Sequence, residues 1–236
     1  MDIEILGSGS DGNCYIINDG ETNLMIDCGI PMQEIKVKTN FFETPIDGCL
    51  ITHSHGDHIL SASDLMKHGI QCYMSMTTLR ESHIESNLLK ARSTQIKHNK
   101  EIEIGTFTVR PLQMNHDVHC LGFLIYSSVT KEKLFFATDT CYIRYVIPPV
   151  DYIMIESNYD LDILNTRIQG GETDMVAKDR LIKAHMSIGT AIDWLESQNL
   201  SKCRRIYLMH LSEGSSNEKE FKLRVMATTG CPVTVC

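Results

Sequence analysis

The sequence of 236 residues has little of several features that define whole classes of protein. Lysine and arginine number 22 against 30 aspartates and glutamates, so the net charge of -8 argues against a protein that coats nucleic acid through bulk positive charge. Apolar runs are short, residues 48–51 being an example, and we expect no segment that spans a bilayer. The first residues lack the cationic start and the apolar stretch of a signal peptide, so secretion by that route is not expected.

Cysteine is present, but not in a pattern that indicates disulfides. The nine cysteines are scattered without a CxxC pair, whereas a disulfide framework is denser and belongs to shorter, secreted chains. We interpret them as reduced, mostly buried thiols of a cytoplasmic protein. Because 42% of the residues are hydrophobic, the chain can bury a sizeable core, which excludes intrinsic disorder.

No repeat, low-complexity tract or linker divides the chain, so we predict a single domain over residues 1–236. Apolar runs and turn signals predict strands at residues 3–6, 14–17, 24–26, 49–52, 106–109, 122–126, 134–137, 152–155 and 206–209. Helices are predicted at about 59–68, 174–182 and 188–197. Strands with interleaved helices indicate an α/β layered fold, in which two sheets carry helices on their outer faces.

Histidine is abundant, and three of the ten fall in one stretch, His53-Ser54-His55-Gly56-Asp57-His58, called here the HSHGDH loop. Three imidazoles and a carboxylate need partners when they are buried, and a divalent metal provides them. His53 and His55 alternate to one side of an extended segment, while Asp57 and His58 lie in the turn that follows. The spacing therefore predicts two metals rather than one.

Two metals need more ligands than this loop provides. His116, Asp139 and His210 each follow an apolar run that is predicted as a strand. Because strand ends can converge on one edge of a sheet, we predict that these three side chains complete the metal centre.

The motif HxHxDH after a strand, followed by a lone histidine, an aspartate and a late histidine, resembles the metallo-β-lactamase superfamily over essentially the whole chain. The segments GSGSDGNC (7–14), IDCG (26–29), HD (116–117), TDT (138–140), ESNYD (156–160) and HLS (210–212) are most similar to its YycJ-type branch. Members of that branch are described as 5′ exonucleases that prefer single strands. The resemblance implies a metallo-β-lactamase fold, a four-layer αβ/βα sandwich of two mixed β-sheets flanked by helices, with the metals at one edge of the sheets.

The resemblance also implies roles for individual residues. One metal would be held by His53, His55 and His116, and the other by Asp57, His58 and His210, with Asp139 bridging the two. Asp27 matches the superfamily's first motif, an acidic residue that steadies the HSHGDH loop without touching the metal. A turn aspartate at the end of a strand is the alternative interpretation of Asp27.

Charge arithmetic then predicts the substrate. Two divalent ions bring roughly +4, and the catalytic Asp57, the bridging Asp139 and a hydroxide leave about +1, which suits a phosphodiester monoanion. We predict that a metal-bridged hydroxide attacks phosphorus in line. Zinc and manganese are the expected ions, and iron is a further option, because a His- and Asp-rich site accepts all three.

The leaving alkoxide needs a proton, and His185 is the candidate donor. It lies where relatives such as ribonuclease Z carry a catalytic histidine paired with a glutamate, which Glu156 matches here. A carboxylate that holds an imidazole raises its pKa and orients it. Ala184 and Ile188 depart from the usual Gly-His-Leu-Ser-Asn of the YycJ-type branch, so a histidine that caps a helix is the alternative.

These features predict a metal-dependent hydrolase, most of all a nuclease that acts on single-stranded DNA ends. A phosphodiesterase of a small cyclic nucleotide or cyclic phosphate is the first alternative, because a small substrate needs no basic track. A metal-stabilised binding protein without activity is the second. We expect no membrane partner, and a homo-oligomer stays open.

Overall fold

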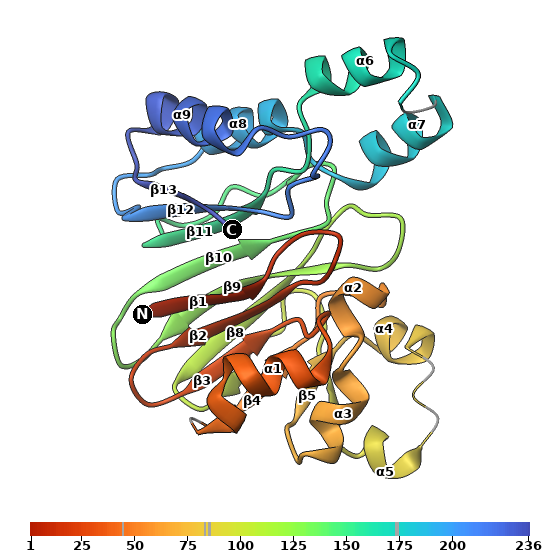
Figure 1. Cartoon of the computed structure of the whole chain (residues 1–236). Helices are drawn as coiled ribbons and strands as arrows, with labels where there is room; N and C mark the ends of the chain where they lie inside the picture. The colour runs from red at the N-terminus through yellow and green to blue at the C-terminus, as the bar shows by residue number, and fades with distance from the viewer. Residues whose placement is uncertain (44, 83, 85, 173–174) are drawn as a thin grey trace. The chain divides into compact units, whose positions relative to one another are not determined.

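The computed structural model of the chain describes residues 1–43, 45–82, 84, 86–172 and 175–236. These residues form two compact units. The first consists of Met1–Gln113 and Val118–Glu132, and the second of Met114–Asp117 and Lys133–Cys236. Figure 1 labels their helices and strands. None of the described helices combines the length with the apolar character that crossing a membrane requires.

A six-stranded mixed sheet organises the first unit. Its strands lie side by side in chain order: β1 (Asp2–Gly7), β2 (Cys14–Asn18), β3 (Asn23–Ile26), β4 (Gly48–Leu50), β5 (Cys72–Met74) and β6 (Ser93–Gln95). The pairs β1–β2 and β2–β3 are antiparallel, and the pairs from β3 to β6 are parallel. Short turns join the antiparallel strands, whereas the parallel ones need crossover connections that contain helices.

The helical segments of this unit are α1 (Met32–Lys38), η1 (Asn40–Phe42), α2 (Gly56–Ile59), α3 (Ala62–Lys67), α4 (Met76–Glu81) and α5 (Asn87–Lys90). The helices α1 and α3 lie on one face of the six-stranded sheet (Figure 1). There Ile35 and Leu65 join Met25, Cys49 and Cys72 of the strands in one buried apolar cluster. This cluster is the core that supports the loops at the ends of β3 and β4.

The helix expected over residues 59–68 is two helices, α2 and α3. Ser61 between them donates its backbone N–H to the carbonyl of Cys28 and its hydroxyl to the carbonyl of Ile30, at 2.9 and 2.7 Å. These long-range bonds interrupt the helix and fasten it to the loop after β3. Sequence periodicity contains no signal for such a contact.

Three antiparallel strands complete the first unit: β7 (Ile102–Ile104), β8 (Phe107–Gln113) and β9 (Leu121–Ser127). The buried carboxylate of Asp19, in the turn after β2, accepts hydrogen bonds from the hydroxyls of Thr106 and Ser127 at 2.7 and 2.6 Å. Asp19 thereby ties the turn after β2 to the ends of β8 and β9.

The second unit has a parallel sheet in the order β10 (Lys133–Ala137), β11 (Tyr152–Glu156), β12 (Arg205–Met209) and β13 (Val233–Val235). Its helices are α6 (Leu161–Gln169), α7 (Met175–Ala184), α8 (Ile188–Glu196) and α9 (Glu218–Thr229). The helices α8 and α9 cover one face of this sheet (Figure 1). Trp194 of α8 stacks on Phe135 of β10 with ring centroids 5.1 Å apart.

Each strand that the apolar runs predict is present within a residue or two, except that β8, predicted at 106–109, continues to Gln113. The patterns did not predict β5, β6, β7, β13, α1, α4, α5, α6 or α9. In α9 only Phe221 and Val225 are buried, so the helix lacks the repeated apolar spacing that identifies a helix in a sequence. The helix predicted from residue 174 begins at Met175, and Asp174 itself lies outside the described residues.

Candidate metal centre

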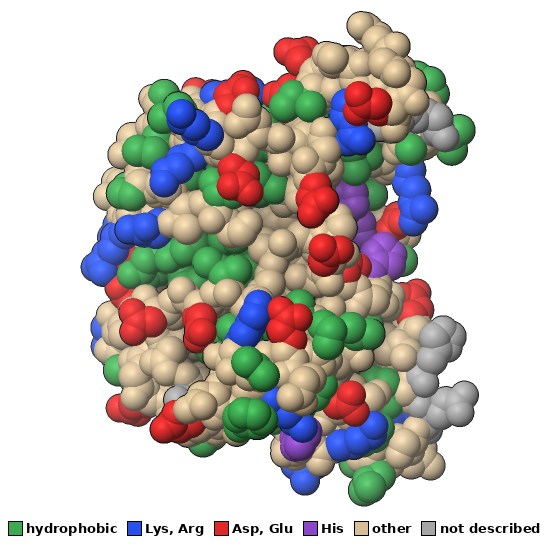
Figure 2. Space-filling view, viewed as in Figure 1, with side chains coloured by type: hydrophobic (Ala, Val, Ile, Leu, Met, Phe, Trp, Pro, Cys, Tyr) green, Lys and Arg blue, Asp and Glu red, His purple; other side chains and the backbone are tan. Residues whose placement is uncertain are grey.

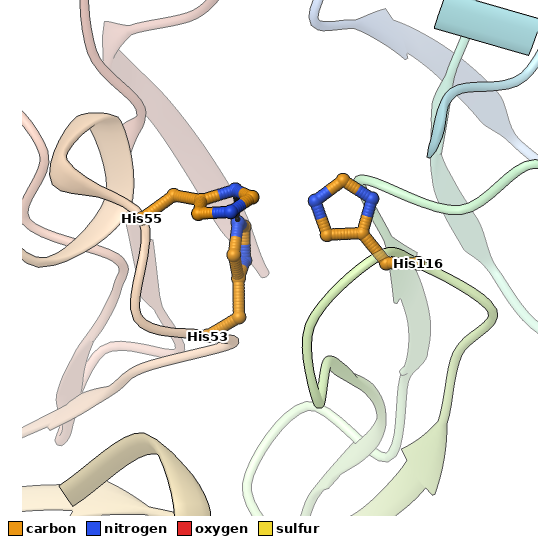
Figure 3. Close-up of side chains that lie close together, drawn as sticks. All are labelled: His53, His55 and His116. Atoms are coloured by element: carbon orange, nitrogen blue, oxygen red, sulfur yellow. Dashed lines mark hydrogen bonds between the residues drawn. The ribbon is translucent and has the colours of Figure 1, made fainter. Parts of the chain in front are cut away.

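The first group of candidate ligands lies on the HSHGDH loop, which follows β4 in the first unit. The rings of His53 and His55 meet edge to face with centroids 4.8 Å apart, and Nε2 of His53 is 3.1 Å from Nδ1 of His55 (Figure 3). The helix α2 begins at Gly56, so Asp57 and His58 lie in its first turn. Oδ2 of Asp57 is 3.4 Å from Nε2 of His58, which brings these two side chains together as well.

Asp27 forms hydrogen bonds that orient two of these imidazoles. Its carboxylate is fully buried, and Oδ2 accepts a bond from Nδ1 of His58 at 2.7 Å. Both of its oxygens accept the hydroxyl of Thr52, at 3.0 and 2.9 Å. That hydroxyl lies 2.9 Å from Nδ1 of His53 and, having donated its hydrogen to Asp27, accepts one from His53. Both imidazoles therefore carry their proton on Nδ1, an assignment that rests on the hydrogen-bond network and makes Nε2 the unprotonated nitrogen of each ring, the atom type that binds a metal.

The glycine-rich loop before β2 reaches the same place through Asn13. The side chain of Asn13 is buried, and its Nδ2 donates to Nε2 of His58 at 3.0 Å, which agrees with a proton on Nδ1 of that ring. Nδ2 also contacts the carbonyl of Gly9 at 2.9 Å, and the backbone N–H of Asn13 donates to the carbonyl of Asp57 at 2.7 Å. Turn formation explains the glycines of this loop, whereas Asn13 holds the loop against α2.

Gly29 allows a second close approach to α2. A Cβ atom at this position would lie 1.7 Å from the carbonyl oxygen of Asp57, so no side chain fits. The neighbouring N–H of Cys28 donates to the carbonyl of His58 at 2.8 Å. The segment after β3 thus supports the HSHGDH loop through its backbone as well as through Asp27.

The second group of candidate ligands lies in the second unit, at the carboxyl ends of neighbouring parallel strands. Asp139 follows β10, Glu156 ends β11 and His210 follows β12. Together with His185 they offer donor atoms that all lie within 4.8 Å of one another. Nε2 of His210 is 3.7 Å from Oδ1 of Asp139, and the rings of His185 and His210 stack with centroids 5.2 Å apart.

Glu156 holds His185 and the loop after β10 at the same time. Its carboxylate is fully buried; Oε1 is 2.7 Å from Nδ1 of His185, and Oε2 accepts the backbone N–H groups of Thr140 and Met186 at 2.8 and 3.2 Å. Nδ1 of His185 also lies 3.3 Å from Oδ1 of Asp139.

The protonation states of this pair follow from burial and mutual attraction. Burial alone raises the pKa of Glu156, but the adjacent His185 outweighs burial and holds this pKa below its ordinary value. For His185 burial lowers the pKa, and the attraction and hydrogen bond of Glu156 outweigh it, so the pKa lies above its ordinary value. The pair is therefore an ionised carboxylate and an imidazole that retains its second proton more readily than a histidine in water.

His116 and His210 are also oriented through Nδ1. His116, the third residue labelled in Figure 3, belongs to the second unit and donates from Nδ1 to the carbonyl of Ala184 at 2.8 Å. Nδ1 of His210 lies 3.0 Å from the amide nitrogen of Asn158 and 3.5 Å from Oε1 of Glu156. On the other side of each ring, Nε2 of His116 lies 3.1 Å from Oδ1 of Asp117, and Nε2 of His210 lies 3.7 Å from Oδ1 of Asp139.

Three of the candidate residues have backbone conformations that are uncommon for residues other than glycine. The φ angles of Asp27, Asp139 and His210 are 57°, 47° and 54°, and each residue lies one or two positions after the end of a strand. Such a left-handed conformation costs about 1 kcal/mol or more per residue and is characteristic of functional sites. Here it turns each side chain out of the line of its strand.

The donor sets fit divalent metal ions. Nε2 of His53, His58 and His116 is a nitrogen donor atom that now contacts His55, Asn13 and Asp117 respectively, and Asp57 and Asp139 add carboxylates. Nitrogen and carboxylate donors without thiolate suit zinc, manganese or iron.

Comparison with known proteins identifies the family. Residues 22–211 match the family model of the β-lactamase superfamily domain. The chain belongs to this superfamily. The prediction of a metallo-β-lactamase fold with mixed sheets flanked by helices is thereby confirmed. The family, together with the curated relatives described next, also confirms the prediction of a metal-dependent hydrolase.

Two curated relatives align with most of this chain. Exodeoxyribonuclease WalJ of Streptococcus pneumoniae serotype 2 (strain D39) is 28% identical over 231 residues, which cover 92% of this chain and 83% of that protein. Exodeoxyribonuclease YycJ of Bacillus anthracis is 25% identical over 223 residues, or 90% of this chain and 83% of that protein. Among solved structures, the metallo-β-lactamase fold protein YhfI of Bacillus subtilis matches with a TM-score of 0.75 and 16% identity, covering 99% of this chain and 95% of that one.

Proposed function

We propose that this chain is a nuclease, a dinuclear metal-dependent phosphodiesterase that removes nucleotides from the 5′ ends of single-stranded DNA. The observation that carries the proposal is the ion pair of Glu156 and His185 beside Asp139, an oriented proton donor next to a candidate metal ligand. The two curated exodeoxyribonucleases, aligned over 92% and 90% of the chain, support DNA as the substrate.

The proposed ligands hold two ions, zinc or manganese, with iron as the alternative. One ion is assigned to His53, His55 and His116, the other to Asp57, His58 and His210, and the bridge to Asp139. The tautomers that Asp27 and Thr52 impose support this assignment, because each makes Nε2 the unprotonated nitrogen of its ring. When bound, the ions polarise the phosphodiester and lower the pKa of water, so that hydroxide is available near neutral pH.

His185 acts as the general acid in this proposal. Nδ1–H stays bonded to Glu156, and Nε2–H delivers its proton to the alkoxide oxygen that leaves phosphorus. Glu156 acts through His185: it raises the pKa of the imidazole and holds the ring in place, so we treat it as a positioning residue. Asp57, which we predicted both as a catalytic residue and as a metal ligand, acts in this proposal through the ion that it holds.

The proposal treats residues 1–236 as one hydrolase domain in the cytoplasm. The free state of the nine cysteines supports a reducing compartment. Self-association stays a prediction.

The test is hydrolysis of single-stranded oligonucleotides by protein that has been depleted of metal and then loaded with zinc or manganese. On a strand labelled at its 5′ end we expect early release of labelled mononucleotide. On a strand labelled at its 3′ end we expect a ladder of labelled fragments that shorten from the 5′ end. Inactivity of fully loaded protein on single strands, duplexes and RNA would overturn the proposal. Turnover of a cyclic nucleotide panel instead would assign the small-substrate alternative, and a metal content below one ion per folded chain would favour the binding protein.

A further inference from the structure

The segment that follows Asp139 alternates exposed side chains with buried or half-buried ones over residues 142–147. Residues 141–150 form neither helix nor strand. Tyr142 is 46% exposed and Val146 is 80% exposed, and Arg144 between them is exposed as well. Ile143 and Ile147 point the other way and are buried. Tyr142, Arg144 and Val146 therefore lie on one side of the chain, and we call them the Tyr142 ridge.

The near end of the ridge is fastened to the candidate site. The backbone N–H of Thr140 donates to the buried carboxylate of Glu156 at 2.8 Å, and its hydroxyl donates to the carbonyl of Tyr142 at 2.8 Å. The N–H of Cys141 donates to the carbonyl of Asn115, the residue before His116, at 3.0 Å. The carboxylate that orients the proposed acid thus also positions the start of the ridge.

The far end of the ridge is fastened to α8. Nε1 of Trp194 donates to the carbonyl of Tyr145 at 2.9 Å, and the N–H of Ile147 donates to the side chain of Gln198 at 3.0 Å. A segment held at both ends loses little further entropy when a ligand binds to it. The exposed ring and guanidinium are therefore presented on an ordered support.

The chemistry of the ridge matches a single-stranded nucleic acid. An exposed aromatic ring stacks on a base, and an arginine pairs with a phosphate or stacks on a base. Residues 140–150 contain one arginine and no acidic residue, in a chain of net charge -8. The face shown in Figure 2 mixes acidic and basic side chains. With a net charge of -8, recognition of a strand depends on local groups more than on bulk positive charge.

We propose that the Tyr142 ridge binds the nucleic-acid strand whose end enters the metal centre, with Tyr142 stacked on a base and Arg144 paired with a phosphate. Val146 extends the apolar contact to the neighbouring sugar or base. This inference rests on the proposed nuclease function and names the residues that contact the strand beyond the phosphodiester that is cleaved.

The test measures binding of a fluorescent oligothymidylate with cleavage-resistant phosphorothioate linkages to the metal-loaded protein by fluorescence anisotropy. Stacking predicts that Tyr142→Ala weakens binding about 5- to 100-fold, whereas Tyr142→Phe binds like wild type. Arg144→Gln should weaken binding and lower the slope of log Kd against log salt by about 0.7. The control is Lys222→Gln, on the exposed side of α9, which should bind like wild type.

The outcomes separate the ridge from the nuclease proposal. Suppose that wild type binds and cleaves the strand, but Tyr142→Ala and Arg144→Gln bind it within twofold of wild type and have unchanged melting temperatures. Strand binding by the Tyr142 ridge is then overturned, and the proposed nuclease function stands. If wild type neither binds nor cleaves any nucleic acid, the proposed function fails and the ridge with it. A change of sedimentation in Tyr142→Ala would instead assign the ridge to contact with a second copy of this chain.

Discussion

Replacement of Asp27 by asparagine tests whether the buried carboxylate sets the tautomers of the metal-binding histidines. In wild type, Oδ2 of Asp27 accepts the proton on Nδ1 of His58 at 2.7 Å. The amide NH2 of an asparagine in that position would face another donor. The conflict is relieved when His58 moves its proton to Nε2, but this removes the lone pair that a metal needs.

The expected loss of metal affinity follows from that change. Removal of a partner that orients a metal-binding histidine typically lowers metal affinity 10- to 100-fold, or about 1.4–2.8 kcal/mol. The stability of the metal-free protein should fall by less, about 1 kcal/mol, since burial raises the pKa of Asp27 and the neutral amide avoids the cost of a buried charge. The signature of Asp27→Asn is therefore a loss of affinity that exceeds the loss of stability.

The assay is competition of the protein against a chromophoric zinc chelator, combined with urea unfolding of the metal-free protein. Asp19→Asn is the matched control, because Asp19 is also a buried carboxylate of the first unit with several hydrogen-bond donors, but none of these donors lies on the HSHGDH loop. Asp19→Asn should lower stability and leave zinc affinity unchanged. Zinc affinity of Asp27→Asn within twofold of wild type would refute the tautomer argument.

Further predictions concern the packing at Gly29, the pH dependence of stability and the proposed general acid, His185. Gly29→Ala should destabilise the protein by about 3 kcal/mol or more in urea unfolding, because its Cβ would lie 1.7 Å from a carbonyl oxygen of α2, whereas Gly56→Ala meets no atom within 4 Å and should be tolerated. Burial raises the pKa of Asp19, but the hydrogen bonds that its carboxylate accepts outweigh burial and lower this pKa below its ordinary value. The contribution of Asp19 to the free energy of unfolding should therefore be complete above about pH 4 and disappear as pH falls through the lowered pKa. The stabilities of Asp19→Asn and wild type should then converge in acid. Glu156→Gln should retain metal and lower kcat on oligonucleotides about 100-fold, because His185 loses the charge that keeps it protonated; a rate within threefold of wild type would contradict its positioning role.

The sequence predicts the parts of this site that depend on local pattern. An apolar strand followed by a polar residue identifies Asp139 and His210 as strand-end groups, and the parallel sheet brings them together within the second unit, whereas Glu156 was predicted only from the resemblance. The clustering of His53 and His58 follows from their separation of five positions. These relations need no knowledge of packing between distant segments.

Other parts arise only in the folded chain. Asn13 and His58 are 45 positions apart, and their contact depends on the close approach that Gly29 allows. Thr52 looks like the last residue of a strand in the sequence, and its role as a relay between Asp27 and His53 appears only when β3 and β4 pair. No periodicity or motif reports such contacts.

The most direct test of the account is hydrolysis of bis-p-nitrophenyl phosphate by metal-depleted protein that is reloaded with zinc or manganese, with Asp139→Ala measured beside wild type. We expect wild type to hydrolyse the diester after either metal is restored. Asp139→Ala should be folded by circular dichroism but inactive. Activity of Asp139→Ala within a few fold of wild type would contradict the bridging assignment. Silence of fully metal-loaded wild type would contradict phosphodiesterase chemistry itself.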